Sequence, residues 1–241
     1  MENQVKISEQ DPKAKVATMF DSIAGRYDFL NHLLSFGIDK IWRKKAIDVI
    51  SKTHKKSKIL DVACGTGDLA IAALKLDPEH ITGIDISQKM IDLGSEKIKK
   101  KGISEKIDLL TGDSEKINFY DDSFYVAMVA FGVRNFTDLH RGLAEMKRVI
   151  RKGGLIMILE FSKPSGYFFR KIYSLYFLRI LPFIGKLFSK NKQAYSYLPQ
   201  SVMQFPDGQH FIDILNQTGL AEIKQQQLSF GIATIYTGLK L

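Results

Sequence analysis

The chain has 241 residues, enough for one large domain with a full hydrophobic core, and we expect a single domain over residues 1–241. Its apolar and charged fractions, 45% and 25%, are those of an ordinary globular protein and exclude a disordered chain. The single cysteine, Cys64, excludes an intramolecular disulfide and a cysteine metal cluster, so a reducing compartment is expected.

The net charge of +9 is concentrated in one segment. Between Glu160 and Asp207 there are seven Lys or Arg residues and no acid, whereas the rest of the chain holds 28 basic and 26 acidic residues. Such local basicity predicts an anionic partner that meets this segment. The chain has no uncharged apolar run near the about 20 residues that a spanning helix needs. Its N-terminal residues lack the apolar stretch of a signal peptide.

The predicted elements follow in chain order. Residues 1–15 are polar and are expected to be disordered. From 16 to 52 the apolar residues recur three and four apart, which predicts N-terminal helices with breaks at Gly25 and Gly37. Short apolar runs then alternate with helical patterns. They predict strands at 58–63, 80–86, 106–113, 124–131 and 155–161, and helices at 68–76, 88–101 and 139–150, the last stopped by Gly153 and Gly154.

After an insert over residues 162–206, the pattern predicts a helix at 208–219 and two strands at 220–229 and 232–240. The whole order predicts an α/β fold with a Rossmann-like, doubly wound, mostly parallel seven-stranded sheet. The two consecutive last strands predict an antiparallel edge strand. Such a sheet binds ligands at the carboxyl ends of its strands, so functional residues should follow the strands.

The strongest local motif is ILDVACGTGD, residues 59–68, where a strand runs into a glycine-rich turn and a helix. Gly65 and Gly67 allow the backbone to approach a ligand closely. The pattern also satisfies Gly-x-Gly-x-x-Ala through Ala70, so a dinucleotide fold is an alternative. Asp61 favours another ligand, because a carboxylate at this strand end repels a pyrophosphate and attracts an ammonium or sulfonium group.

Acidic residues also end the next two strands. Asp85 comes 20 residues after Gly65, where a carboxylate suits the two hydroxyls of a ribose. Asp113 and Ser114 in the TGDS stretch, residues 111–114, would lie near an adenine, and Asp113 can accept a hydrogen bond from its amino group. The series predicts an adenosine cofactor that carries a cationic group.

In these residues the chain resembles the class I methyltransferases that use S-adenosylmethionine. In those enzymes the Asp-x-x-x-Gly-x-Gly turn and the acids after the second and third strands line the cofactor site. The resemblance implies S-adenosylmethionine as methyl donor, S-adenosylhomocysteine as product and no metal. It implies these cofactor-binding residues: Asp61, Gly65, Thr66, Asp85, Asp113 and Ser114.

Longer blocks resemble the menaquinone/ubiquinone C-methyltransferases, over about residues 20–240. They are YDFLNHLLSFGIDKIWRK (27–44), FGVRNFTD (131–138), RVIRKGG (148–154) and LEFSKP (159–164). The resemblance implies methylation of a ring carbon of a prenylated quinol, converting a demethylmenaquinol to menaquinol. A ubiquinone precursor quinol and another hydrophobic phenolic molecule are the alternatives. The chain departs from many members at Asp39, where they have His, and at Ala130, where they have Ser.

Two residues after the fourth strand are the candidates for catalysis, because this fold places its acceptor there. Arg134 is expected to stabilise a quinolate or hold a water, and Asn135 to hydrogen-bond a quinol oxygen. The alternative for Arg134 is that it pairs with an acid and caps the turn. The five histidines lie in unrelated blocks, so none is an obvious base.

The insert residues Ser165–Lys192 are aromatic, aliphatic and basic. Arg179 and Pro182 interrupt them, so they are expected to form an acceptor lid rather than a membrane span. This lid would receive an isoprenoid tail and rest on anionic lipid. The alternative is a packed helical subdomain with a solvated basic rim. We therefore expect a bacterial cytoplasmic protein at the inner face of the cytoplasmic membrane.

Three rival functions remain to be tested. A nucleic-acid methyltransferase would be basic too, but here the charge is interleaved with Phe, Leu and Ile, and no Asn-Pro-Pro-Tyr-like motif follows the fourth strand. We therefore expect no nucleic-acid partner. A nicotinamide oxidoreductase and a non-enzymatic binding protein are the other rivals, and self-association into a homo-oligomer is left open.

Overall fold

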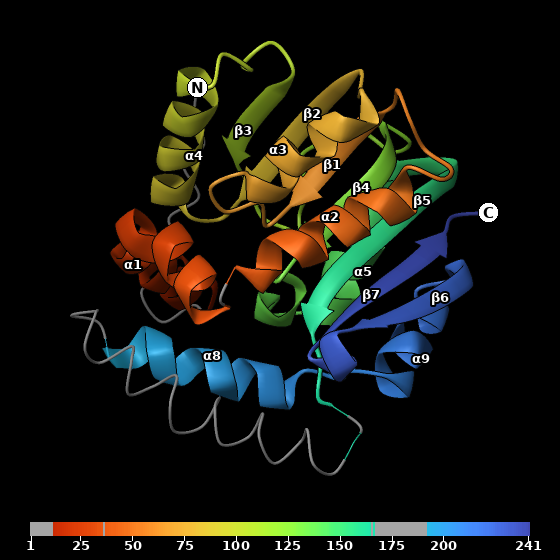
Figure 1. Cartoon of the computed structure of the whole chain (residues 1–241). Helices are drawn as coiled ribbons and strands as arrows, with labels where there is room; N and C mark the ends of the chain where they lie inside the picture. Colours follow the sequence, from red (N-terminus) through yellow and green to blue (C-terminus); the bar gives the residue numbers. More distant parts are fainter. Residues whose placement is uncertain (1–11, 36, 165, 167–191) are drawn as a thin grey trace.

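The computed structural model describes residues 12–35, 37–164, 166 and 192–241. Its centre is one seven-stranded sheet in the order β3-β2-β1-β4-β5-β7-β6 (Figure 1). The strands are β1 Lys58–Val62, β2 His80–Asp85, β3 Ile107–Thr111, β4 Phe124–Ala130, β5 Ile150–Phe161, β6 Ala221–Leu228 and β7 Ala233–Leu239. The helices are α1 Pro12–Leu34, α2 Ile38–Ile50, α3 Asp68–Ala73, α4 Gln88–Lys100, α5 Leu139–Val149, α8 Lys192–Gln204 and α9 Gln209–Gln217, with short 3₁₀ turns η1 Leu74–Leu76, η2 Val133–Asn135 and η4 Ser229–Gly231.

The pairing confirms the predicted fold class. Strands β3, β2, β1, β4 and β5 are parallel, whereas β7 pairs antiparallel with both β5 and β6 at one side of the sheet. The chain winds outward from β1 to β3 and then returns to β4 on the other side of β1. The carboxyl ends of β1 and β4 are therefore the switch point, where a ligand is expected.

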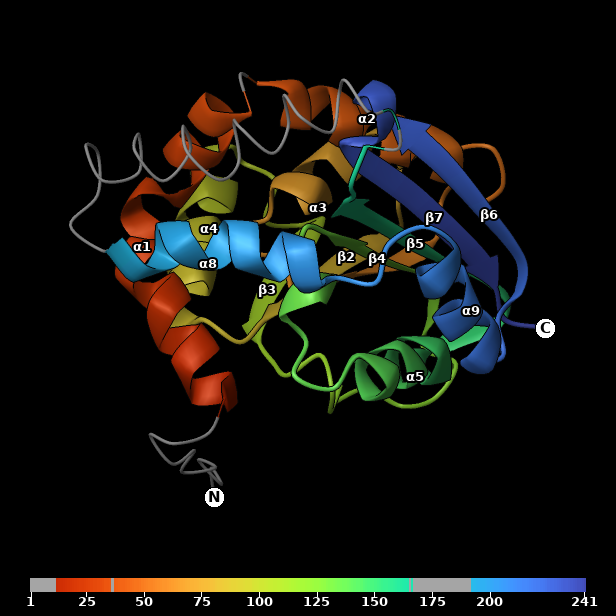
Figure 2. The same cartoon turned by 90° about the horizontal axis from the view of Figure 1, so that it is seen from below.

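Helices cover both faces of the sheet (Figure 2), and a hydrophobic core lies between each set of helices and the sheet. Strand β1 is buried after its first residue, as expected for a parallel strand covered on both faces. One core packs α2, α3 and α4 against one face, with Trp42, Ala73 and Ile98 among its members. The other packs α5 and α9 against the opposite face, with Leu143 and Phe211 among its members.

Three boundaries differ from the sequence-based expectation. Helix α1 begins at Pro12, a first-turn position that suits proline, and it runs through Gly25, so the predicted break there was wrong. The break at Gly37 is confirmed, because this glycine has a left-handed φ of 72° before α2. Helix α5 ends at Val149, one residue before the predicted Ile150, whereas β5 begins at Ile150, five residues before the predicted start at Leu155. The Gly153 amide donates to the Lys240 carbonyl at 2.6 Å, so Gly153 pairs with the C-terminal end of the chain and lies within the sheet.

Helices α1 and α8 lie across the carboxyl end of the sheet, where the β5 arrow points (Figure 1). Helix α1 packs against α2, α4 and α8. Most of the predicted lid, Ser165–Lys192, lies outside the described residues, which omit 165 and 167–191. Helix α8 is the C-terminal part of the predicted insert over residues 162–206. No helix in the described part of the chain is long and apolar enough to cross a membrane.

Candidate active site at the carboxyl edge

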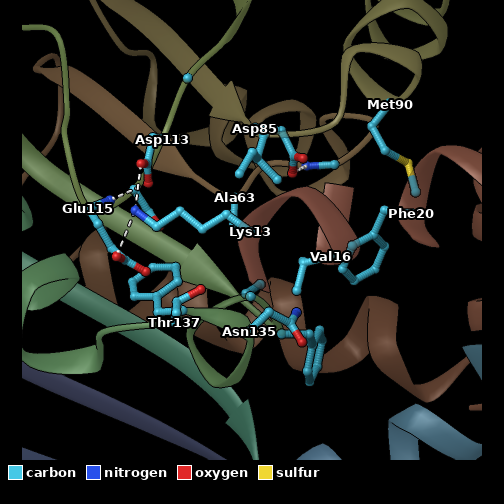
Figure 3. A pocket seen from close by; sticks show the side chains of 18 residues that line it. Lys13, Val16, Phe20, Ala63, Asp85, Met90, Asp113, Glu115, Asn135 and Thr137 are labelled. Atoms are coloured by element: carbon cyan, nitrogen blue, oxygen red, sulfur yellow. Dashed lines mark hydrogen bonds and ion pairs between the residues drawn. The ribbon is translucent and has the colours of Figure 1, made fainter. Parts of the chain in front are cut away.

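A pocket with a cavity volume of about 70 Å³ lies at the carboxyl ends of the central strands, beside α1 (Figure 3). Its walls come from α1, the turn after β1, the ends of β2 and β4, the loop after β3, and η2 with the residues that follow it. The lining side chains and backbone include Lys13, Val16, Phe20, Ala63, Gly65, Asp85, Met90, Asp113, Ser114, Glu115, Phe131, Asn135 and Thr137. Five predicted site residues are thus brought together: Gly65, Asp85, Asp113, Ser114 and Asn135.

The turn after β1 is shaped by left-handed backbone. Ala63, Gly65 and Gly67 have φ angles of 52°, 55° and 82°. The left-handed φ of Gly67 favours glycine, and a Cβ there would also come within 3.3 Å of the Leu109 side chain, which is a tight contact. The turn presents its backbone to the pocket, which fits a ligand approached closely by the main chain.

Asp85 joins this turn to the second strand. Its carboxylate accepts hydrogen bonds from the Gly65 amide at 2.8 Å and the Ser87 amide at 2.9 Å. Burial raises the pKa of Asp85, although these two amides act in the opposite direction. A carboxylate has about four acceptor positions, so Asp85 can also accept from two ribose hydroxyls.

Asp61 lies below the turn, is 1% exposed and does not line the cavity. Neither of its carboxylate oxygens has a hydrogen-bond partner within the described structure. Burial raises its pKa well above the ordinary value for an aspartate, and the Ala70 amide and the charge of Arg43 offset burial only in part. An unpaired buried carboxylate is unfavourable, so Asp61 is suited to a cationic ligand group such as the ammonium of S-adenosylmethionine.

The neighbouring thiol of Cys64 is not a nucleophile at neutral pH. Burial, followed by the negative charges of Asp61 and Asp85, raises the pKa of Cys64 well above that of a free thiol. Because a thiolate is the reactive form of cysteine, Cys64 is a packing residue here.

Helix α1 is fastened over the pocket at two points. The Lys13 ammonium contacts the carboxylates of Asp113 and Glu115, each at 2.7 Å (Figure 3). Further along the same helix, the Asp21 carboxylate accepts a hydrogen bond from the Ser87 hydroxyl at 2.5 Å. Burial lowers the pKa of Lys13, but the hydrogen bonds and charges of the two acids outweigh burial and raise it overall.

Sequence reasoning missed this role of α1, because residues 1–15 were expected to be disordered. A signal was present in the spacing. Lys13, Val16 and Phe20 are three and four residues apart, and all three line the pocket. They lie on one face of a helix that begins earlier than expected.

The two catalytic candidates in η2 have different surroundings. Asn135 lines the cavity, and its side-chain oxygen accepts from the Tyr197 hydroxyl of α8 at 3.1 Å. Arg134 does not line it. The Arg134 guanidinium forms a 2.7 Å ion pair with Glu160, and the two side chains are 6% and 0% exposed. The pairing of Arg134 with an acid, given above as the alternative, is therefore present.

Arg134 also ties several walls of the site together. Its guanidinium donates to the Phe131 carbonyl and to the Ser201 hydroxyl, the latter at 3.3 Å. It lies 5.4 Å from the centre of the Phe161 ring. Arg134 thus connects the ends of β4 and β5 with α8.

Thr66 is the remaining predicted residue, and its side chain faces away from the cavity. It is 5% exposed, and its hydroxyl accepts from the Lys97 ammonium at 2.8 Å. The Lys97 ammonium also contacts Asp68 at 2.8 Å. These contacts brace the glycine turn against α4.

A second depression, of about 490 Å³, lies at the opposite edge of the sheet. It is lined by Lys52 and Thr53 after α2, by Leu155 and by residues of β6 and β7 such as Leu239. It is larger, but it is remote from the strand ends that carry the acids. Within the described residues, no group of three or more His, Cys, Asp or Glu is placed to hold a metal ion.

The chain is similar in sequence to known methyltransferases. The model of the ubiE/COQ5 methyltransferase family matches residues 6–240. The chain is 45% identical over 239 residues to a demethylmenaquinone methyltransferase of Bacteroides fragilis, covering 99% of this chain and 95% of that one. It is 47% identical over 228 residues to a ubiquinone/menaquinone biosynthesis C-methyltransferase of Geotalea daltonii, covering 94% and 96%.

Solved structures agree on the fold. A SAM-dependent methyltransferase from Thermotoga maritima superposes with a TM-score of 0.66 at 19% identity, covering 93% of this chain and 99% of that one. A second, from Aquifex aeolicus, gives 0.63 at 15% identity, covering 89% and 98%. The sheet order, the glycine turn and the family match lead to one conclusion: the chain belongs to the ubiE/COQ5 family of S-adenosylmethionine-dependent methyltransferases.

Proposed function

We propose that the enzyme methylates a ring carbon of a demethylmenaquinol to give menaquinol. Asn135 is the observation that carries the proposal, because it lines the cofactor pocket at the end of β4, where an acceptor would meet the cofactor. Family membership and a relative named demethylmenaquinone methyltransferase at 45% identity support the substrate class. A ubiquinone precursor quinol is the second candidate, since a relative at 47% identity is named for both quinones.

The cofactor residues have separate tasks in this proposal. S-adenosylmethionine supplies a methyl group already activated by its sulfonium sulfur. Asp61 attracts the cationic end, Asp85 holds the ribose hydroxyls, and Asp113 with Ser114 receives the adenine. Gly65 keeps the backbone close to the ligand, and Thr66 supports the turn from behind. Fixing the donor in this way contributes to the rate through positioning.

Asn135 acts on the acceptor. Its side-chain oxygen is engaged by the Tyr197 hydroxyl, so its NH₂ group is the part left to donate to a quinol oxygen. Burial raises the pKa of Tyr197, which keeps the phenol protonated and able to hold Asn135 in this orientation. A donor at the quinol oxygen stabilises the quinolate, whose charge is delocalised onto the ring carbon that is methylated.

Arg134 positions the same turn in this proposal. It is held by Glu160, Phe131 and Ser201, so it fixes η2 and keeps Asn135 in the pocket wall. Its charge also lies next to the site where a quinolate would form. Both contributions depend on the pair with Glu160 remaining intact.

The function is tested directly by complementation. The chain would be expressed in a bacterial host that lacks its own quinone C-methyltransferase, and the extracted quinones would be identified by mass. We expect menaquinone to regain its methyl group. Recovery of ubiquinone alone would support the second candidate, and recovery of neither would reject a quinol substrate.

An Asn135→Leu substitution is expected to lower kcat for methyl transfer by about 10²–10³-fold, as removal of one oxyanion donor does. The cofactor dissociation constant should stay within about twofold, because the lost donor faces the acceptor. Tyr197→Phe should lower kcat less, since it misorients the amide without removing it. Asn216→Leu, an exposed position on α9, is the matched control. Normal turnover in the Asn135 variant would remove this residue from the mechanism.

A Lys13→Met substitution is expected to speed cofactor binding. The cavity of about 70 Å³ is smaller than the about 300–1,000 Å³ of typical ligand pockets, so α1 must shift to admit S-adenosylmethionine. Lys13 holds α1 closed through partly exposed ion pairs worth up to about 1 kcal/mol, so its loss should raise the association rate about fivefold. Surface plasmon resonance on the immobilised enzyme measures this rate. Lys15→Met, exposed on the same helix, should leave it unchanged.

We also propose that the enzyme works in the cytoplasm at the inner face of the membrane. A prenylated quinol is dissolved in the bilayer, so a water-soluble active site must meet it there. The seven basic residues without an acid between Glu160 and Asp207 support contact with anionic lipid.

A further inference from the structure

Helix α2 presents an unusual outward face. Trp42, Ala46 and Ile50 are buried on its inner face. Ile41 is 54% exposed on the outside, next to the exposed lysines Lys40, Lys44 and Lys45. An isolated exposed isoleucine needs no explanation, but one surrounded by basic residues combines the two features that an anionic lipid surface attracts.

The η4 turn adds an aromatic side chain beside this helix. Phe230 is 71% exposed, and its backbone is left-handed, with a φ of 60°. Such a conformation is unfavourable for a bulky residue and is retained where the surrounding structure imposes it, often at functional sites. The Trp42 indole donates to the Ser229 hydroxyl at 2.9 Å, so the turn is held against α2.

Both elements lie at the same edge as the pocket. The Ser162 amide, just after β5, donates to the Ile232 carbonyl at 3.0 Å, which places η4 at the carboxyl end of β5. The Trp42 ring lies 6.0 Å from the ring of Phe131, a pocket residue. Figure 2 looks onto this edge, with α1, α2 and α8 around the site.

We infer that Lys40, Ile41, Lys44, Lys45 and Phe230 form a docking surface for an anionic lipid bilayer at the edge of the sheet that carries the pocket. The inference rests on the proposed function, since a bilayer-dissolved substrate is what calls for it. Apolar side chains would enter the interface while the lysines meet acidic headgroups. A second copy of this chain is the less suitable occupant, because a self-matching contact would bring the same lysines together.

Vesicle co-sedimentation of the full-length protein tests the charged part. Lys40→Gln, Lys44→Gln and Lys45→Gln would be combined in one variant. Its control combines Lys99→Gln, Lys100→Gln and Lys101→Gln at the far end of α4, which removes the same charge from exposed positions. On phosphatidylglycerol-rich vesicles we expect about 100-fold weaker binding for the first variant and wild-type binding for the control, with no binding of either to phosphatidylcholine. Equal loss in both variants, or loss in neither, would overturn the proposal.

Phe230→Asn tests the apolar part without harming the fold, because asparagine tolerates the left-handed backbone better than phenylalanine. Tyr120→Asn, at a 91% exposed aromatic near the opposite edge, is its control. We expect weaker vesicle binding for Phe230→Asn alone. Light scattering of each variant without lipid measures its oligomeric state and so tests a second copy of the chain as the occupant. Loss of a dimer together with unchanged vesicle binding would assign the surface to that second copy.

Turnover on a short-chain, water-soluble quinol in lipid-free buffer separates this inference from the proposed function. All the surface variants should keep wild-type turnover, because none of these residues lines the pocket. If the wild type methylates no quinol, the proposed function fails whatever the vesicles show. If turnover is normal and the surface variants still bind vesicles as the wild type does, the docking surface alone is rejected.

Discussion

An Asp61→Asn variant is expected to be more stable than the wild type and to bind S-adenosylmethionine more weakly. Replacing a buried unpaired carboxylate by a neutral amide should raise the free energy of unfolding by about 1–3 kcal/mol. The same change removes the attraction for the cofactor's cationic end, so the dissociation constant should rise about 10–100-fold. Calorimetric titration and thermal unfolding measure the two effects.

The stability gain should depend on pH with a definite sign. Burial raises the pKa of Asp61 in the folded protein. At acidic pH the carboxyl is protonated in the folded and unfolded states, and the two proteins should be about equally stable. As pH rises from the unfolded-state pKa to the higher folded-state pKa, the wild type alone loses stability, so the difference between the two free energies of unfolding should grow. Asp92→Asn, at an exposed position on α4, is the matched control. An Asp61 variant less stable at every pH would contradict this account.

A Glu160→Ala variant is expected to lose about 3–5 kcal/mol of stability, because it leaves the buried Arg134 guanidinium without its carboxylate partner. Glu160 also accepts from the Arg134 amide at 3.3 Å and the Phe161 amide at 2.9 Å, and these donors would lose their partner. For a chain of this length the midpoint of thermal unfolding should fall by about 6–20 °C. Differential scanning calorimetry measures the shift.

The double variant Arg134→Met/Glu160→Leu separates stability from catalysis. Replacing both members of a buried pair by apolar residues often restores stability, so its unfolding midpoint should lie well above that of Glu160→Ala, although the Arg134 and Phe161 amides still lack their acceptor. Turnover should stay about 100-fold or more below the wild type, because the charge beside the acceptor and the tie to Phe131 are both gone. Full turnover in a stable double variant would leave the ion pair with a structural role only.

The positions of Asp85 and Asp113 were predictable, because parallel strands bring their carboxyl ends to one edge and the acids directly follow those strands. The direction in which other side chains point could not be predicted from the sequence. Thr66 is turned away by Lys97, 31 residues distant, and Arg134 is held by Glu160, 26 residues distant. Strand order fixes where a backbone segment lies, whereas the partner of a polar side chain depends on packing between separate elements.

The N-terminal helix shows the same limit. Lys13 meets Asp113 from 100 residues away, and no local pattern indicates that pairing. Gly25 and Gly153 were interpreted as helix stops from glycine's low helix propensity. Contacts with other parts of the chain override that preference at Gly25, where α1 continues, whereas helix α5 does end before Gly153.

Trp42 gives the enzyme an optical property of practical use. It is the one tryptophan in the sequence, and it lies between the ring of Phe131 in the pocket wall and the hydroxyl of Ser229 under the η4 turn. Its fluorescence therefore comes from a single position that touches both the cofactor side and the proposed lipid side. The fluorescence emission of the unlabelled protein can therefore report cofactor binding in the presence and absence of vesicles. The difference between the two cofactor affinities measures the energetic coupling between cofactor and bilayer without a dye.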